Sequence, residues 1–290
     1  MKLLTAAALA LAAFGADAAL AHERILFVGN SFTMGANSSA LRYRADSVEA
    51  LGEANIGGIP AIFERFAEQA GFEWEASHEL RGGSDLAYHL SEKRQAIDKP
   101  WDVVVLQQYS TLDAKNPGNP ASTARDAPEL ARLVTARNPG VKVYLLATWT
   151  RADQAYKPTG HWFGKPLATM AIDVRRALDA ADAASDDIDG VIPVGEAWQR
   201  AIEAGVADAN PYDGRDFGKV DLWSYDQYHA SAEGSYLEAL VVFAQITGYD
   251  VRRFGAGEKA ANELGIDPKV AAALQKVAME QFDDAATASD

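Results

Sequence analysis

Short apolar runs alternate with longer amphipathic stretches about five times along the chain, and this alternation limits the folds that the chain can adopt. The runs at 103–106 and 143–147 are almost continuous in apolar residues, which is typical of parallel strands buried on both faces. The pattern predicts an α/β protein, a three-layer α/β/α sandwich around a mostly parallel sheet of about five strands. The five runs are RILFVG, EWEASHEL, WDVVVLQQ, VKVYLLATW and GVIPVG.

The first 21 residues have the pattern of a secretory signal peptide. Lys2 precedes an apolar stretch at 3–16, and small residues follow before residue 22. Asp17 ends this stretch before it reaches the roughly 20 residues needed to span a bilayer, so a membrane anchor is the weaker alternative. We therefore expect 1–21 to be cleaved, and the mature protein to be periplasmic or secreted without stable membrane insertion.

The rest of the chain is expected to form one domain over 22–281, followed by a disordered tail at 282–290. Two segments interrupt the alternation, at 36–58 and 205–228, and both are rich in turn-forming residues. Long loops in compact domains are often functional, so 205–228 is expected to be either a lid or a wall of a site.

The composition excludes several classes of protein. A net charge of −14 argues against nucleic acid or an anionic membrane surface as the partner. The chain has no cysteine, which excludes disulfides, thiolate metal sites and cysteine nucleophiles. Asp208, Asp213 and Asp216 raise the alternative of a metal-dependent hydrolase, but neither His-Glu-x-x-His nor EF-hand spacing is present. We expect no metal and no cofactor.

Ser31 follows the first apolar run, in ILFVGNSFTMG. Because ligands bind at the carboxyl ends of the strands in a parallel α/β sheet, Ser31 is placed where a nucleophile would act. Taken alone, the stretch fits equally a serine that caps a turn.

A serine nucleophile needs a general base, usually a histidine that a carboxylate orients. His229 follows the fifth strand and precedes a helix that Ser231 could cap, and Asp226 lies three residues before it. A tight turn could bring Asp226 onto Nδ1 of His229 while Nε2 points toward Ser31. A pair of turn residues is the alternative for Asp-x-x-His, and it weakens once a serine lies at the same sheet edge.

Donors for an oxyanion are expected after the second and third strands. Gly83, in LRGGSDL, offers a backbone amide at a turn where the chain can approach a substrate closely. Gln107 or Gln108, in VVLQQYST, offers a side-chain amide, with a purely structural role as the alternative.

Trp149 and Arg151 follow the fourth strand and are expected to line the same pocket. Trp149, together with Trp162 and Trp223, could stack on sugar rings, although all three fit a buried core equally well.

These residues resemble the SGNH (GDSL-like) hydrolase superfamily, and in particular a subgroup of exported bacterial proteins with Gly-Asn-Ser-Phe in the first block. FVGNSFT matches the first block, RGGSDL the second and DQYHASAEGSYLEA the last, so the resemblance covers about 24–250. It implies a flavodoxin-like sandwich and a triad of Ser31, His229 and Asp226. Asn30 occupies the place of the usual aspartate, at the pocket, where it would support the Ser31 turn.

The third block departs from the family pattern. Members typically carry Gly-x-Asn-Asp, whose asparagine completes the oxyanion hole, whereas this chain has LQQYST. Gln107 or Gln108 would then replace that asparagine. The sequence thus predicts an exported serine esterase that removes a small acyl group, such as acetyl, from a carbohydrate. The alternatives are a lipid or lysophospholipid esterase and a non-catalytic carbohydrate-binding protein on the same fold.

Overall fold

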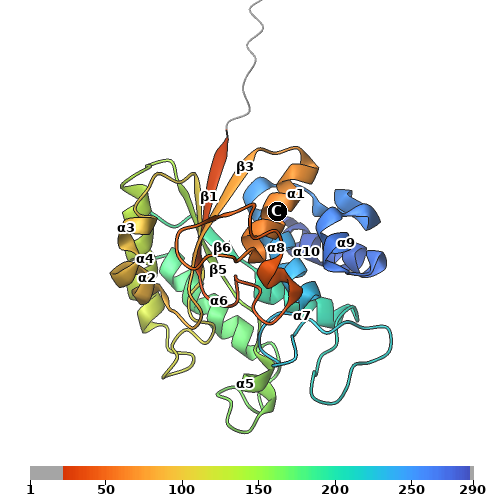
Figure 1. Ribbon diagram of the computed structural model, residues 1–290. Coiled ribbons are helices and arrows are strands. Elements are labelled where there is room, and N and C mark those ends of the chain that lie inside the picture. The colour runs from red at the N-terminus through yellow and green to blue at the C-terminus, as the bar shows by residue number, and fades with distance from the viewer. Residues whose placement is uncertain (1–21, 288–290) are drawn as a thin grey trace, which may run out of the picture.

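A six-stranded, all-parallel sheet forms the middle layer of the protein (Figure 1). The computed structural model describes residues 22–287, so the expected signal peptide at 1–21 lies outside the described residues. The strand order is β2-β3-β1-β4-β5-β6. The strands are β1 (Glu23–Gly29), β2 (Glu49–Ala50), β3 (Trp74–Leu80), β4 (Val103–Leu106), β5 (Lys142–Leu146) and β6 (Gly190–Ile192).

The predicted α/β/α sandwich is confirmed, and each of the five predicted runs contains a strand of this sheet. The sixth strand, β2, lies inside 36–58, where only a connection was expected. It has two residues, both exposed, and pairs with β3 at the sheet edge. Such a short, exposed edge strand needs no apolar pattern, so the sequence gives no signal for it.

Helices cover both faces of the sheet because alternate side chains of its strands point to opposite sides. In β1, Ile25 and Phe27 pack into one cluster of buried side chains, and Leu26 and Val28 into the other. The first cluster includes α1 (Gly58–Ala70), α7 (Val194–Glu203), α8 (Ala232–Thr247), η2 (Val251–Gly257), α9 (Lys259–Leu264) and α10 (Pro268–Thr287). The second includes α2 (Leu86–Glu92), α3 (Arg94–Ile97), α4 (Ala121–Thr135) and α6 (Thr169–Asp182).

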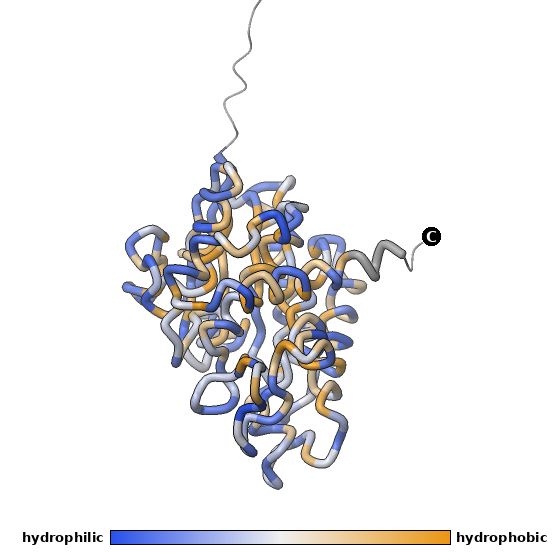
Figure 2. The backbone as a smooth tube through the Cα atoms, turned by 90° about the vertical axis from the view of Figure 1, so that its right-hand side faces the viewer, coloured by the Kyte–Doolittle hydropathy of each residue, from blue (hydrophilic) through white to orange (hydrophobic). Residues whose placement is uncertain are grey.

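The hydropathy of the chain follows this layering. In Figure 2 the hydrophobic segments run through the interior, and the hydrophilic ones form most of the outer turns. None of the helices in residues 22–287 is long and apolar enough to cross a membrane.

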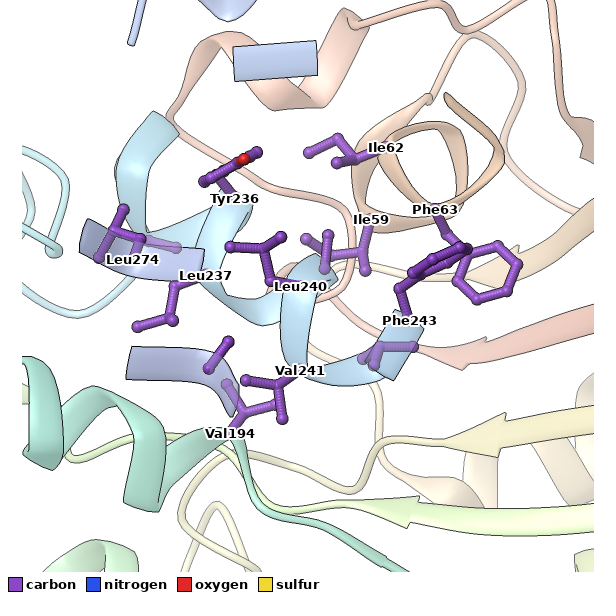
Figure 3. Packing of buried hydrophobic residues seen from close by; sticks show 14 of the residues in the cluster. Ile59, Ile62, Phe63, Val194, Tyr236, Leu237, Leu240, Val241, Phe243 and Leu274 are labelled. Carbon is purple, nitrogen blue, oxygen red and sulfur yellow. The ribbon is translucent and has the colours of Figure 1, made fainter. Parts of the chain in front are cut away.

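The helix α8 forms the centre of one face. It is buried without interruption from Gly234 to Ala244, and Figure 3 shows its side chains between those of α1, α7 and α10. Ser231 accepts a hydrogen bond from the amide of Gly234 at 3.1 Å, which confirms the expected N-cap. This cap fixes the start of α8 at Ala232, three residues after His229.

The C-terminal boundary differs from the prediction. The helix α10 continues to Thr287, so the boundary expected at 281 falls inside it. The alanines of DDAAT favour a helix, and they directly continue the helical sequence before them, so the acidic composition does not end the helix here.

Two short elements lie in the connections beyond the carboxyl ends of strands. They are η1 (Ser39–Arg42), after β1, and α5 (Ala152–Tyr156), after β5. In Figure 1 the chain enters β1 from the top, so the strands' carboxyl ends face the lower side, where α5 lies.

Candidate active site

Ser31 lies in a tight turn that begins where β1 ends. A Cβ atom at Gly29 would come within 2.9 Å of Oε1 of Gln107, so a larger residue would displace the side chain of Gln107. Asn30 is buried and holds both sides of the turn: its Nδ2 donates to the carbonyl of Ser84 at 3.0 Å, and its Oδ1 accepts from the amide of Phe32 at 3.2 Å. Ser31 is therefore presented on a fixed backbone.

The structure brings Ser31, His229 and Asp226 together, although 198 residues separate the first two. Nε2 of His229 lies 2.8 Å from Oγ of Ser31, and Nδ1 lies 2.6 Å from Oδ2 of Asp226. The other oxygen of Asp226 accepts from the amides of Tyr228 and His229 at 3.2 and 3.1 Å. With Nδ1 protonated and facing the carboxylate, Nε2 is free to take a proton from the serine.

The electrostatics of the pair favour a neutral imidazole beside a charged carboxylate. Burial lowers the pKa of His229 below its usual 6.5, and this effect outweighs the opposing influence of Asp226. Burial would by itself raise the pKa of Asp226, but the hydrogen bonds from His229 and from nearby backbone amides bring it below its ordinary value. His229 is thus available as a base near neutral pH.

Asn37 is a member of this site that the sequence reasoning missed. Its Nδ2 donates to Oδ2 of Asp226 at 2.7 Å and lies 3.2 Å from Nδ1 of His229. Its backbone is left-handed, with φ of 64°, and its carbonyl accepts a hydrogen bond from Ser224. The only available signal was an asparagine, which tolerates this conformation, in a long connection just after Ser31.

Replacing Asn37 with glycine is expected to lower about tenfold the kcat of a reaction in which His229 is the base for Ser31, because a hydrogen bond to a charged group is worth about 1.5 kcal/mol. Glycine keeps the left-handed backbone without strain. Asn55→Gly is the matched control, since Asn55 lies in the same connection with φ of 65°. Steady-state kinetics give kcat for both variants. Equal losses of kcat in the two would show that Asn37 acts only by maintaining the conformation of its loop.

Gln107 and Gln108 use their side-chain oxygens to hold backbone. Oε1 of Gln107 accepts from the amide of Asn30 at 3.0 Å, and its Nε2 donates to the carbonyl of Gln108. Oε1 of Gln108 accepts from the amides of Leu86 and Tyr109 at 3.1 and 2.8 Å, while its buried Nε2 has no partner in the described part of the chain. Their part in an oxyanion hole stays a prediction.

Two backbone amides are candidates for the oxyanion donors instead. The amides of Ser31 and Gly83 donate to no other group within residues 22–287, and both residues line the same cavity. Gly83 has φ of 72°, which explains the need for glycine there.

The cavity beside Ser31 has a volume of about 160 Å³. Arg151 forms one wall, with its guanidinium 4.3 Å from the centre of the Tyr228 ring, 2.8 Å from Asp153 and 3.3 Å from Oγ of Ser110. The lining residues are Asn30, Ser31, Phe32, Gly83, Tyr109, Ser110, Arg151 and Tyr228.

Trp149 does not line this cavity, which corrects its expected place in the pocket. It is fully buried, stacks on Trp198 at 4.4 Å and donates its Nε1 to the carbonyl of Tyr228 at 3.0 Å. Trp162 and Trp223 are buried as well, so none of the three is exposed to stack on a sugar. The hydrogen bond from Trp149 instead fixes the backbone of Tyr228, the residue before His229.

The acidic residues of 205–228 shape their own loop. Asp208 accepts from the amides of Asn210 and Asp216 at 3.0 and 2.6 Å, and Asp216 pairs with Lys219 at 2.7 Å. Through these contacts, the carboxylates stabilise the turns of their own loop.

The comparisons with known proteins bear mainly on the fold. No family model matches the chain, and no curated protein matches it either. Among solved structures, a DUF4886 family protein from Bacteroides uniformis has a TM-score of 0.64 at 20% identity, covering 90% of this chain and 94% of that one. A candidate SGNH hydrolase from Slackia heliotrinireducens has a TM-score of 0.50 at 25% identity, covering 76% and 97%.

A candidate GDSL-like lipase from Parabacteroides merdae is similar as well, with a TM-score of 0.51 at 16% identity, covering 78% of this chain and 96% of that one. The chain therefore has the α/β fold that is found in SGNH hydrolases.

Proposed function

We propose that this protein is an exported serine esterase that removes a small acyl group, such as acetyl, from a carbohydrate. The observation that carries the proposal is the chain of contacts from Ser31 through His229 to Asp226, at 2.8 and 2.6 Å, which opens onto the cavity of about 160 Å³. Sharing a fold with proteins described as an SGNH hydrolase and a GDSL-like lipase supports ester hydrolysis. Export rests on the sequence pattern of 1–21.

The geometry suits a two-step acyl transfer. Oγ of Ser31 attacks the ester carbonyl while Nε2 of His229 takes its proton, and Asp226 stabilises the resulting imidazolium. The amides of Ser31 and Gly83 donate to the oxyanion. His229 then gives its proton to the leaving alcohol, and in the second step it activates a water that releases the acyl group as an acid.

The lining of the cavity argues for a short acyl group. Its described side chains are polar or aromatic, and none is aliphatic, so a long acyl chain would find little apolar surface. The small volume points the same way. A lipid or lysophospholipid substrate fits these features less well.

The proposal is tested on the mature protein with a fluorophosphonate probe and a series of p-nitrophenyl esters. We expect one covalent adduct, mapped to Ser31, and the highest kcat/KM on acetate, with a steady fall toward octanoate. The release of acetate from acetylated xylan, with deacetylated xylan as the control, then tests whether the substrate is an acylated carbohydrate. A preference for octanoate would favour the lipid esterase, and glycan binding without turnover or labelling would favour the binding protein.

The pH profile of kcat/KM should have an acid limb below pH 6.5, because burial lowers the pKa of His229 and only the neutral imidazole acts as a base. Activity is therefore full above that pKa and falls tenfold per pH unit below it. Asp226→Asn should move the midpoint lower still, since the carboxylate raises the pKa of His229. A midpoint above pH 6.5, or one that Asp226→Asn leaves in place or raises, would contradict this account of His229.

A further inference from the structure

A second set of serine, histidine and carboxylate lies buried next to Gly83. Nε2 of His89 lies 2.9 Å from Oγ of Ser84, and Nδ1 of His89 is hydrogen-bonded to Oε2 of Glu79. All three residues are buried, and His89 and Glu79 are at most 1% exposed. Substrate cannot reach this serine, so the set is not a second catalytic triad.

The contacts of these residues converge on one loop. Nε2 of His89 also lies 3.0 Å from the carbonyl of Gly29, at the end of β1, and the hydroxyl of Ser84 donates to the carbonyl of Arg81 at 2.8 Å. The loop of residues 81–84 is thereby tied from α2, through His89, to the strand that precedes Ser31. Asn30 closes the connection by donating to the carbonyl of Ser84 at 3.0 Å.

The loop needs such an anchor because of its composition. Gly82 and Gly83 are consecutive and exposed, and glycine restricts the backbone least of all residues. The strand ladder reaches only to Arg81, whose amide donates to the carbonyl of Gly29 at 3.0 Å. Nothing in the ladder fixes the amide of Gly83, whereas Ser84, the next residue, is held by His89.

The carboxyl of Glu79 is costly to bury, which argues that it serves a purpose. Its Oε1 has no hydrogen-bond partner in the described part of the chain, and Nζ of Lys93 is 3.8 Å away. A buried carboxyl with one oxygen that accepts no hydrogen bond lowers stability compared with an apolar side chain. Its other oxygen fixes the ring of His89, so that Nε2 faces Ser84 and Gly29.

We propose that His89 and Glu79 are positioning residues that hold the amide of Gly83 in place as an oxyanion donor. This inference rests on the proposed function for its catalytic consequence. Neither residue touches the substrate: Glu79 orients His89, His89 holds Ser84, and Ser84 fixes the loop that presents the amide.

The test compares His89→Gln and Glu79→Gln with His78→Gln as the matched control. His78 is as buried as His89 and contacts a backbone carbonyl, that of Ile56, at 3.1 Å. Melting temperature, kcat and KM on p-nitrophenyl acetate, and hydrogen exchange of a peptide covering 80–86 are measured for each protein.

In the two positioning variants we expect kcat to fall about ten- to a hundredfold with KM within about twofold, because an oxyanion donor acts only in the transition state. The double variant should be no slower than His89→Gln, since the two residues act as a unit. Exchange of the Ser84 amide, which donates to the carbonyl of Arg81 at 3.1 Å, should accelerate in these variants. It should remain unchanged in His78→Gln, which keeps kcat even where it loses as much thermal stability.

Equal losses of kcat in His78→Gln would overturn the proposal, because they would reflect stability alone. A parallel rise in KM, or unchanged exchange of the Ser84 amide, would overturn it as well. If wild-type protein and Ser31→Ala show the same rate, the proposed function fails instead, and the exchange measurement still decides whether the pair holds the loop. Should His89→Gln not fold, Glu79→Gln, which preserves volume and removes only the charged partner of His89, gives the same readouts.

Discussion

The Ser31→Ala protein is expected to hydrolyse p-nitrophenyl acetate more slowly than the wild type by a factor on the order of 10⁴ or more. The hydroxyl is the attacking group of the proposed reaction, and its contact with Nε2 of His229 at 2.8 Å supplies the base. Without it, only the oxyanion donors and substrate binding remain, and water must attack in place of the serine.

The fold should survive this substitution. The turn is held by the side chain of Asn30 rather than by the hydroxyl of Ser31, so the melting temperature should change by no more than about 2 °C. Ser91→Ala, which removes an exposed hydroxyl on α2, is the matched control and should keep the wild-type rate. Equal rates for Ser31→Ala and the wild type would overturn the esterase proposal.

The Glu238→Leu protein is expected to be more stable than the wild type at pH 7 by about 2 kcal/mol, which corresponds to a rise in melting temperature of about 4 to 8 °C. Glu238 is fully buried on α8, and both carboxyl oxygens lack a hydrogen-bond partner within the described residues. Leucine of similar size removes the polar group from an apolar environment.

The gain should depend on pH in a defined direction. Burial raises the pKa of Glu238 well above its usual 4.5. Below pH 4.5 the carboxyl is protonated in both the folded and the unfolded states. As the pH rises above 4.5 only the unfolded state releases the proton, so wild-type stability falls and the advantage of Glu238→Leu grows. Thermal melts at pH 4 and pH 7 measure the difference.

Glu64→Leu is the control for this prediction. Glu64 is also buried, but it accepts a hydrogen bond from the amide of Ala76 at 3.0 Å, so its loss should destabilise the protein. If Glu238→Leu destabilises as well, Glu238 has a partner that stabilises the fold, and the prediction is wrong.

The sheet could be predicted from the sequence because its signal is local. The apolar run of β4, Val103–Leu106, indicates a strand buried on both faces whatever surrounds it. The order of the strands, by contrast, was not predicted, because it depends on pairing between distant segments. The strand β2 escaped prediction because two exposed residues at an edge carry no apolar pattern.

Part of the candidate site could likewise be predicted from the sequence, and part could not. The end of the first strand places Ser31, and a spacing of three residues after the fifth strand pairs Asp226 with His229. The sequence therefore predicted that all three lie at one edge of the sheet. Trp149 was misplaced because a tryptophan after a strand looks the same in the sequence whether it faces a pocket or the core.

By itself, the sequence determined the alternating α/β architecture and the sheet edge at which the reactive side chains gather, because apolar periodicity and strand ends are properties of short segments. Only the tertiary structure decided which polar groups partner one another. Asn37 meets Asp226 across 189 residues, and His89 meets Gly29 across 60. Such contacts depend on how distant backbones pack in three dimensions, and a buried polar group takes whichever partner that packing brings within reach.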